Sequence, residues 1–146
     1  MQTSLLKSLL SSEFFNENSG RVKTSIFDEA YVKVYDTIRD SHNKYGHDLS
    51  STDISAVWAV NNASATRTEH EIFQDALAQV EAATPVSLDV AKDVIQQLWQ
   101  QEMFREIAQL SLNASEGSLH VIQKIYEAIE QVKDGIEDED EFGDPV

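Results

Sequence analysis

The sequence predicts an all-α fold, in which a compact bundle of short helices is followed by a helical hairpin with a long first helix. Apolar residues recur at the three- and four-residue spacing of a helix face in nearly every segment before the acidic end of the chain. Ser50 and Thr66 each precede an apolar helical run and are each followed three positions later by an acid, which is typical of helix starts. We therefore expect no strand.

The start of the chain predicts a short helix and then an irregular stretch. The helix is predicted from four leucines at helical spacing: Leu5, Leu6, Leu9 and Leu10. The polar stretch at 13–23 contains Phe14, Phe15 and Gly20. We expect this stretch to form a turn or a short helix with a loop.

A longer helix is predicted from Asp28 onwards, because the apolar residues that follow share one helical face. These residues are Tyr31, Val34, Tyr35, Ile38 and Tyr45. Gly46 stands where a left-handed helix cap belongs, since glycine adopts that conformation without a steric penalty.

The next helix has the clearest start in the chain. Ser50 and Asp53 fit a capping box, and Leu49 with Ile54 has the spacing of a hydrophobic staple. Its apolar residues are Ile54, Val57 and Trp58, and it is expected to end in the Asn61-Asn62 stretch.

A second capping box predicts the following helix. It pairs Thr66 with Glu69 and leads into an apolar face. That face comprises Ile72, Phe73, Ala76, Leu77 and Val80. Pro85 is expected to stop this helix, and Ser87 is expected to cap the next one.

The segment from Leu88 to about Ala114 predicts one long helix, because it contains neither glycine nor proline. It has two apolar stripes, rotated from each other by roughly a quarter turn. The first holds Ala91, Val94, Ile95 and Leu98, and the second holds Trp99, Met103, Ile107, Leu110 and Ala114. A helix with two apolar faces packs against two different partners.

A break at 115–118 and a further helix from Leu119 to Lys133 complete a predicted αα-hairpin. The stripe of this helix comprises Leu119, Ile122, Ile125, Tyr126, Ile129 and Val132. We expect one domain, with a globular helical body at 1–87 and the hairpin at 88–133, whose long first helix is shared with the body. The segment at 134–146 is expected to be a flexible acidic linker.

The charge favours protein partners over nucleic acid. The chain carries 11 bases and 26 acids, for a net charge of −15. Seven of the acids lie at 134–146, so the rest of the chain has a net charge of −8. A surface this negative repels phosphate, and we expect the isolated domain not to bind DNA directly. No signal peptide, membrane span or cysteine is present, which suits a cytoplasmic protein, in the host cytoplasm if it is viral.

The sequence predicts no catalytic, cofactor-binding or metal site. The five glycines fit neither a phosphate loop nor a dinucleotide fingerprint. The histidines, His42, His47, His70 and His120, lack the spacing of metal ligands and are expected at the surface. Asp138 begins a calcium-like run, but Phe142 occupies a ligand position. Trp58 and Trp99 are expected in the core.

The hairpin is the best candidate for function, because its long helix has more apolar surface than a short hairpin buries. We expect self-association through both helices of the hairpin. The candidate surface comprises Trp99, Met103, Ile107, Leu110, Ile122, Ile125, Tyr126 and Ile129.

The order of elements resembles the N-terminal domain of DnaB-family replicative helicases, particularly the phage-type members. The resemblance covers roughly Leu5 to Val132. It rests on Leu5-Leu6-Lys7-Ser8-Leu9-Leu10, on Ile26-Phe27-Asp28 before Val34-Tyr35-Asp36-Thr37-Ile38, on Leu49-Ser50, and on the helix from Asp89 through Phe104-Arg105. Ser8 replaces a glycine frequent in the bacterial helicases, and their central Gly-Gly pair is absent, so no partner-contact residue is carried over.

The resemblance implies a non-catalytic collar, in which hairpins pair into dimers and three dimers form a ring above an ATPase motor. It also implies docking of primase or a helicase loader. The reading frame is then expected to continue past Val146 into a motor with a G-x-x-x-x-G-K-[ST] loop, so that the parent protein is an ATP-dependent helicase. The alternatives are a helicase-binding domain of a primase, a free-standing acidic mimic of DNA, and an adaptor protein.

Overall fold

The structure is a computed structural model that describes residues 1–114 and 123–133. Its helices are α1 (Gln2–Ser8), α2 (Ser12–Asn18), α3 (Glu29–Lys44), α4 (Ser51–Asn61), α5 (Arg67–Ala82) and α6 (Leu88–Ala114). Two 3-10 turns, η1 (Ser19–Arg21) and η2 (Thr24–Ile26), lie between α2 and α3, and residues 123–133 are also helical. No strand occurs in this part of the chain, which confirms the all-α prediction.

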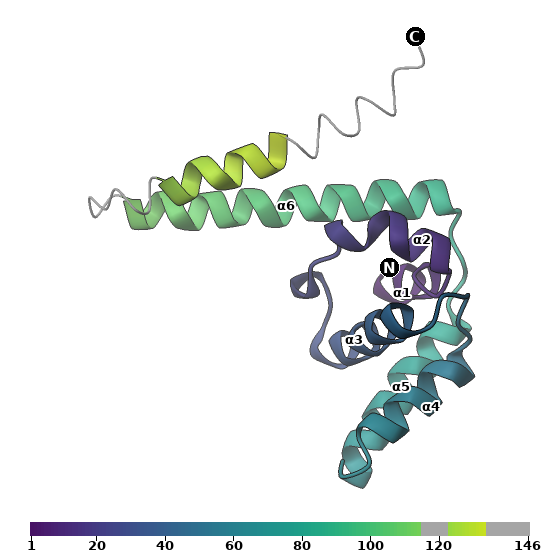
Figure 1. Cartoon of the computed structure of the whole chain (residues 1–146). Coiled ribbons are helices and arrows are strands. Elements are labelled where there is room, and N and C mark those ends of the chain that lie inside the picture. Colours follow the sequence, from purple (N-terminus) through teal and green to yellow (C-terminus); the bar gives the residue numbers. More distant parts are fainter. Residues whose placement is uncertain (115–122, 134–146) are drawn as a thin grey trace. The chain divides into compact units, whose positions relative to one another are not determined.

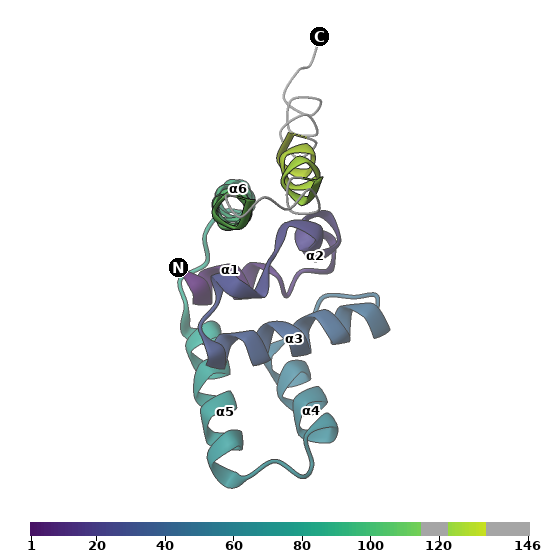
Figure 2. The ribbon, with the colours of Figure 1, turned by 90° about the vertical axis from the view of Figure 1, so that its left-hand side faces the viewer.

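The chain divides into two compact units, Met1–Gln96 and Gln97–Val146. The division falls within α6, so the first part of this helix belongs to the first unit and the rest to the second. In the first unit, α4 and α5 lie side by side and α3 packs against both (Figure 1). Figure 2 shows α3 crossing the pair near one end, with α1 beside it.

Most of the core of the first unit is built from the faces that the helical spacing predicts, but Ile72 and Tyr45, which the same spacing places on those faces, are 47% and 39% exposed. α1 contributes Leu5 and Leu6, with Leu9 directly after it, and α3 contributes Val34 and Ile38. The start of α6 contributes Ala91 and Ile95. The fully buried large side chains are Leu5, Leu6, Leu9, Val34, Ile38, Ile54, Phe73, Val80 and Ile95. Burial of each such side chain stabilises the folded state by about 1.5–3 kcal/mol, so this cluster dominates the stability of the unit.

An aromatic stack joins α4 to α5. The rings of Trp58 and Phe73 lie 4.3 Å apart between centroids and are inclined by only 8°. The imidazole of His70 meets the edge of the Trp58 ring at 4.6 Å and 90°. Both arrangements are favoured by the charge distribution of aromatic rings. Trp58 is buried, as the sequence predicts.

The C-terminal end of α5 is held by polar groups of α1. Lys7 Nζ donates hydrogen bonds to the carbonyl oxygens of Glu81 and Ala83, at 2.7 and 3.0 Å. Ser4 Oγ donates to the carbonyl oxygen of Thr84 at 2.9 Å. Carbonyls at a helix end have no partner within the helix, and a cation there also interacts favourably with the helix dipole. These contacts fix the first helix against a segment some 75 residues later in the chain.

The predicted helix starts are confirmed. Ser50 Oγ accepts from the Asp53 amide at 3.1 Å, and the Asp53 carboxylate accepts from the Ser50 amide at 2.9 Å, which completes the capping box. Thr66 Oγ1 accepts from the Glu69 amide at 3.2 Å. Ser87 Oγ accepts from the amide of Val90 at 3.4 Å at the start of α6.

The capping box makes stability depend on pH. The hydrogen bond from the Ser50 backbone amide, and a further one involving its side chain, hold the pKa of Asp53 below its ordinary value of 3.8. The ionised carboxylate is therefore favoured in the folded state, and its contribution is present above the unfolded pKa and lost as pH falls through the folded one. We expect Asp53→Asn to lower the free energy of unfolding at pH 7, and the difference from wild type to shrink below about pH 4.

Chemical denaturation at pH 7 and at pH 3, followed by circular dichroism, measures this effect. Asp75→Asn is the matched control, because Asp75 is an exposed aspartate in the middle of α5 with no helix end to cap. An Asp53→Asn deficit that is the same at both pH values would contradict the role assigned to the carboxylate.

The cap predicted at Gly46 is wrong. Tyr45 ends α3 in an extended conformation, with φ −117° and ψ 132°, and Gly46 does not adopt a positive φ of the left-handed region. The extended exit has a structural reason: it leads the chain to Leu49, which is buried and whose amide donates to the carbonyl oxygen of Leu10 at 3.0 Å.

The second unit is described for residues 97–114 and 123–133. Trp99 and Met103 of α6 form a buried cluster with Val132 of the helical segment at 123–133, and Ile107 packs against it. The two helices of the predicted hairpin are therefore in contact. The break predicted at 115–118 and the linker predicted at 134–146 lie outside the described residues.

Candidate functional site

The predicted self-association surface is divided by the fold into buried and exposed residues. Met103 has no exposed surface, and Trp99 is also buried. Both side chains face the cluster with Val132 inside the second unit, so they are not free to contact a second chain. Ile107, Leu110 and Ile125 are half-buried. Ile122 lies outside the described residues.

The other two members of that surface remain open. Tyr126 is 66% exposed and Ile129 is 44% exposed. They are three positions apart on the helical segment at 123–133, so they lie on one flank of it. The buried residues of this segment, Ala128 and Val132, are four positions apart and form a second stripe. The segment therefore uses one apolar stripe within the unit and exposes another.

Two further apolar side chains of the second unit are exposed, and the spacing of the sequence did not identify them. Phe104 and Leu112 on α6 lie off the stripe that contains Met103, and more than half of each side chain is accessible. The signal was present in the sequence, because a phenylalanine and a leucine interrupt the polar side of the helix. Single apolar residues of this kind are common on surfaces, which is why the pattern alone did not select them.

The buried part of the second unit is described for residues 97–114 and 123–133. Within these ranges its hydrophobic cluster contains Trp99, Met103 and Val132, with Ile107 partly covered beside them. Tyr126 and Ile129 lie outside this cluster and are exposed.

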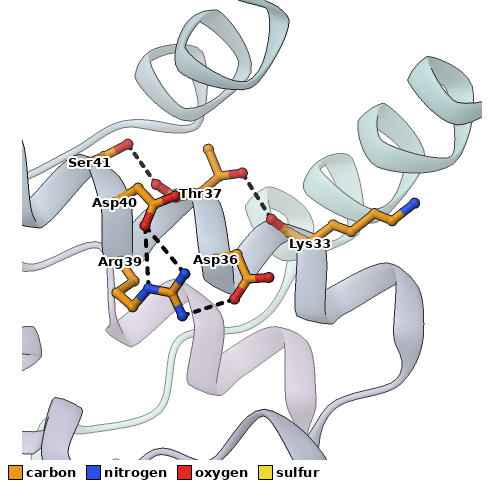
Figure 3. Close-up of polar contacts among 6 residues, drawn as sticks. All are labelled: Lys33, Asp36, Thr37, Arg39, Asp40 and Ser41. Atoms are coloured by element: carbon orange, nitrogen blue, oxygen red, sulfur yellow. Dashed lines mark hydrogen bonds and ion pairs between the residues drawn. The ribbon is translucent and has the colours of Figure 1, made fainter. Parts of the chain in front are cut away.

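A polar cluster lies on α3 in the first unit, where Arg39 bridges two aspartates (Figure 3). Its guanidinium is 3.2 Å from the Asp36 carboxylate and 3.3 Å from that of Asp40. The same guanidinium lies 6.0 Å from the centre of the Tyr35 ring. Burial raises the pKa of Tyr35, and the charge of Arg39 opposes that rise. With two carboxylates and one guanidinium, the cluster keeps one net negative charge.

Beside this cluster, two side-chain hydroxyl groups of α3 form hydrogen bonds within the helix. Thr37 Oγ1 donates to the carbonyl oxygen of Lys33 at 2.9 Å, and Ser41 Oγ donates to that of Thr37 at 2.7 Å (Figure 3). Both side chains are buried. These bonds satisfy polar groups on the packed face of α3, and neither hydroxyl is paired with a base that would make it a nucleophile.

The described histidines do not converge on one site, and the surface position predicted for His42 is wrong. Its ring stacks on Phe15, with centroids 4.5 Å apart, and its Nε2 lies 2.7 Å from the carbonyl oxygen of Leu9, to which it donates. Its Nδ1 atom is buried without a hydrogen-bond partner. His120 lies outside the described residues.

In residues 1–114 and 123–133, no group of three histidine or carboxylate side chains is placed to hold a metal ion. Within the same ranges, none of the helices is both long and apolar enough to span a membrane.

Comparison with protein-family models, with curated proteins and with solved structures found no match to this chain.

Proposed function

We propose that this chain is a non-catalytic helical interaction domain that self-associates through its second unit. The observation that carries the proposal is the open apolar flank at Tyr126 and Ile129. Pairing with a second chain would remove this flank from water. The pairing surface is then Tyr126 and Ile129, with the half-buried Ile125 beside them, in place of Trp99 and Met103.

In its more specific form, the proposal is that of a collar of a DnaB-family replicative helicase. The support is the order of elements, in which several short helices precede a long helix and a shorter apolar one. The collar contributes geometry rather than chemistry: paired second units hold neighbouring motors together, and the outer surface binds primase or a loader. The parent activity is then ATP-dependent DNA unwinding, performed by a motor outside residues 1–146.

The reading frame downstream of codon 146 tests this more specific form. A RecA-like motor with a G-x-x-x-x-G-K-[ST] loop after a strand is the expected result. A stop codon at this point would contradict the collar assignment and leave self-association to be judged by itself.

A second candidate, an acidic mimic of DNA, is favoured by the net charge of −15. The two candidate functions differ in whether the negative charge of the chain competes with DNA for a basic protein. A mimic displaces DNA from a basic protein, whereas a collar does not compete with DNA and does not bind it at ~0.15 M salt. Seven of the acids are concentrated at 134–146 rather than spread along the sequence, which favours the collar.

A further inference from the structure

Helix α4 is apolar on more sides than it buries. Ile54 and Trp58 face the core, but the opposite side carries alanines and Val60, whose side chain is 79% exposed. Asp53 is the only charged residue in the eleven residues of this helix. A helix that is apolar all round is usually covered on every side, so α4 has an uncovered face that the first unit does not use.

A groove runs along this uncovered side, between the end of α3 and α4. One hollow of about 380 Å³ is lined by Tyr45, Val57 and Val60 among others. A second hollow of about 210 Å³ shares Tyr45, Ala56 and Val57 with it and extends toward Asp53. Because the two hollows share three lining residues, they lie next to each other, and together they are referred to below as the α3/α4 groove.

The shape of the α3/α4 groove suits a helix. Helices pack by placing a ridge of side chains into a groove on the neighbour, and α4 supplies both an apolar wall and an exposed ridge at Val60. Eleven residues of α4 correspond to roughly 16 Å of helix, so an occupant of about three turns would cover it.

The charges around the α3/α4 groove favour an occupant with positively charged side chains. Three charged residues line it, namely Asp40, Lys44 and Asp53, and Asp36 and Arg39 adjoin Asp40 through the ion pairs of α3, so the net charge of these five residues is −1. The whole first unit contains 14 acids and eight bases. A second copy of the same face would bring like charges together, whereas a helix with lysine or arginine beside its apolar stripe would not.

We propose that the α3/α4 groove binds an amphipathic helix of another protein, with an apolar stripe flanked by lysine or arginine. This site is separate from the pairing surface of the second unit and does not depend on it. The partner side chains would pack on Tyr45, Val57 and Val60, and the basic residues would lie against the aspartates at the rim.

Selection from a phage-displayed library of random 18-residue peptides on the complete chain tests the proposal. We expect the enriched peptides to have apolar residues at helical spacing and an excess of lysine and arginine. Synthetic copies should bind more weakly by at least about tenfold to Val60→Glu, because the glutamate places a charge on the apolar wall. Their affinity should also fall as salt is raised from ~0.05 to ~0.5 M.

Ile72→Glu is the matched control, since Ile72 is an exposed apolar residue of α5 that is 47% accessible and does not line the α3/α4 groove. It should leave peptide affinity within about twofold of wild type, and circular dichroism should show both variants folded. The proposal is overturned if no peptide is enriched, if the enriched peptides are acidic or lack helical spacing, or if both variants bind alike. Loss of self-association in Val60→Glu would also overturn it, in favour of a second copy as the occupant.

Discussion

Replacing Phe73 with alanine is expected to lower the free energy of unfolding by about 3–5 kcal/mol. Phe73 has no exposed surface, and its ring stacks on that of Trp58 at 4.3 Å. Removing it leaves a cavity between α4 and α5 and also removes the aromatic contact. A small domain has about 5–15 kcal/mol of stability in total, so this one change removes a large share of it.

Urea denaturation followed by circular dichroism measures the effect of Phe73→Ala. The neighbouring substitution Ile72→Ala is the control, because Ile72 is large and apolar but 47% exposed. We expect it to change the free energy of unfolding by no more than about 0.5 kcal/mol. Equal losses in the two variants would show that the orientation assigned to α5 is wrong.

Much of the fold was predictable because its signals are local. The side-chain caps at Ser50 and Thr66 are formed by residues three positions apart, and each lies where the helix begins, although the reciprocal bond of a full capping box is present only at Ser50. The segment from Leu88 to Ala114, which lacks glycine and proline, predicts α6, and all of these residues are helical. Such patterns depend on backbone hydrogen bonding within one turn, so no knowledge of the rest of the chain is needed.

The predictions for Gly46 and His42 were wrong because the structure at these positions depends on residues that are distant in the sequence. Gly46 was expected to cap α3, but the burial of Leu49 and its hydrogen bond to Leu10 require an extended exit. His42 was expected at the surface, but Phe15 and Leu9, about 30 residues earlier, cover part of it. Spacing along a helix cannot show which segment will lie opposite.

The candidate site was predictable only in part, for a related reason. Helical spacing groups apolar residues into stripes, but it does not say which stripe is covered from within the chain. Met103 and Tyr126 both belong to predicted stripes, yet one is fully buried and the other is 66% exposed. Likewise, the apolar character of α4 is visible in the sequence, whereas the α3/α4 groove beside it appears only when α3 is packed against it.

The difference between the buried and the exposed residues of the second unit also decides which substitution tests pairing. Met103→Asp would place a charge in the buried cluster with Trp99 and Val132, and loss of the second unit would follow. Ile129→Glu avoids this difficulty, since Ile129 is 44% exposed within one chain. If pairing follows a two-fold axis, the exposed 44% of two copies of Ile129 is lost from the interface, which corresponds to about 1.3–2.6 kcal/mol and roughly 10- to 80-fold in the dissociation constant.

The most direct test of self-association is the mass in solution of three forms of the chain at tens of micromolar, measured by light scattering. The forms are wild type, Ile129→Glu and the control Gln131→Glu, which adds the same charge to an exposed polar position of the same helical segment. We predict at least twice the 16.4 kDa of one chain for wild type and Gln131→Glu, and 16.4 kDa for Ile129→Glu. A monomeric wild type, or an Ile129→Glu variant that assembles as fully as Gln131→Glu, would contradict the proposal.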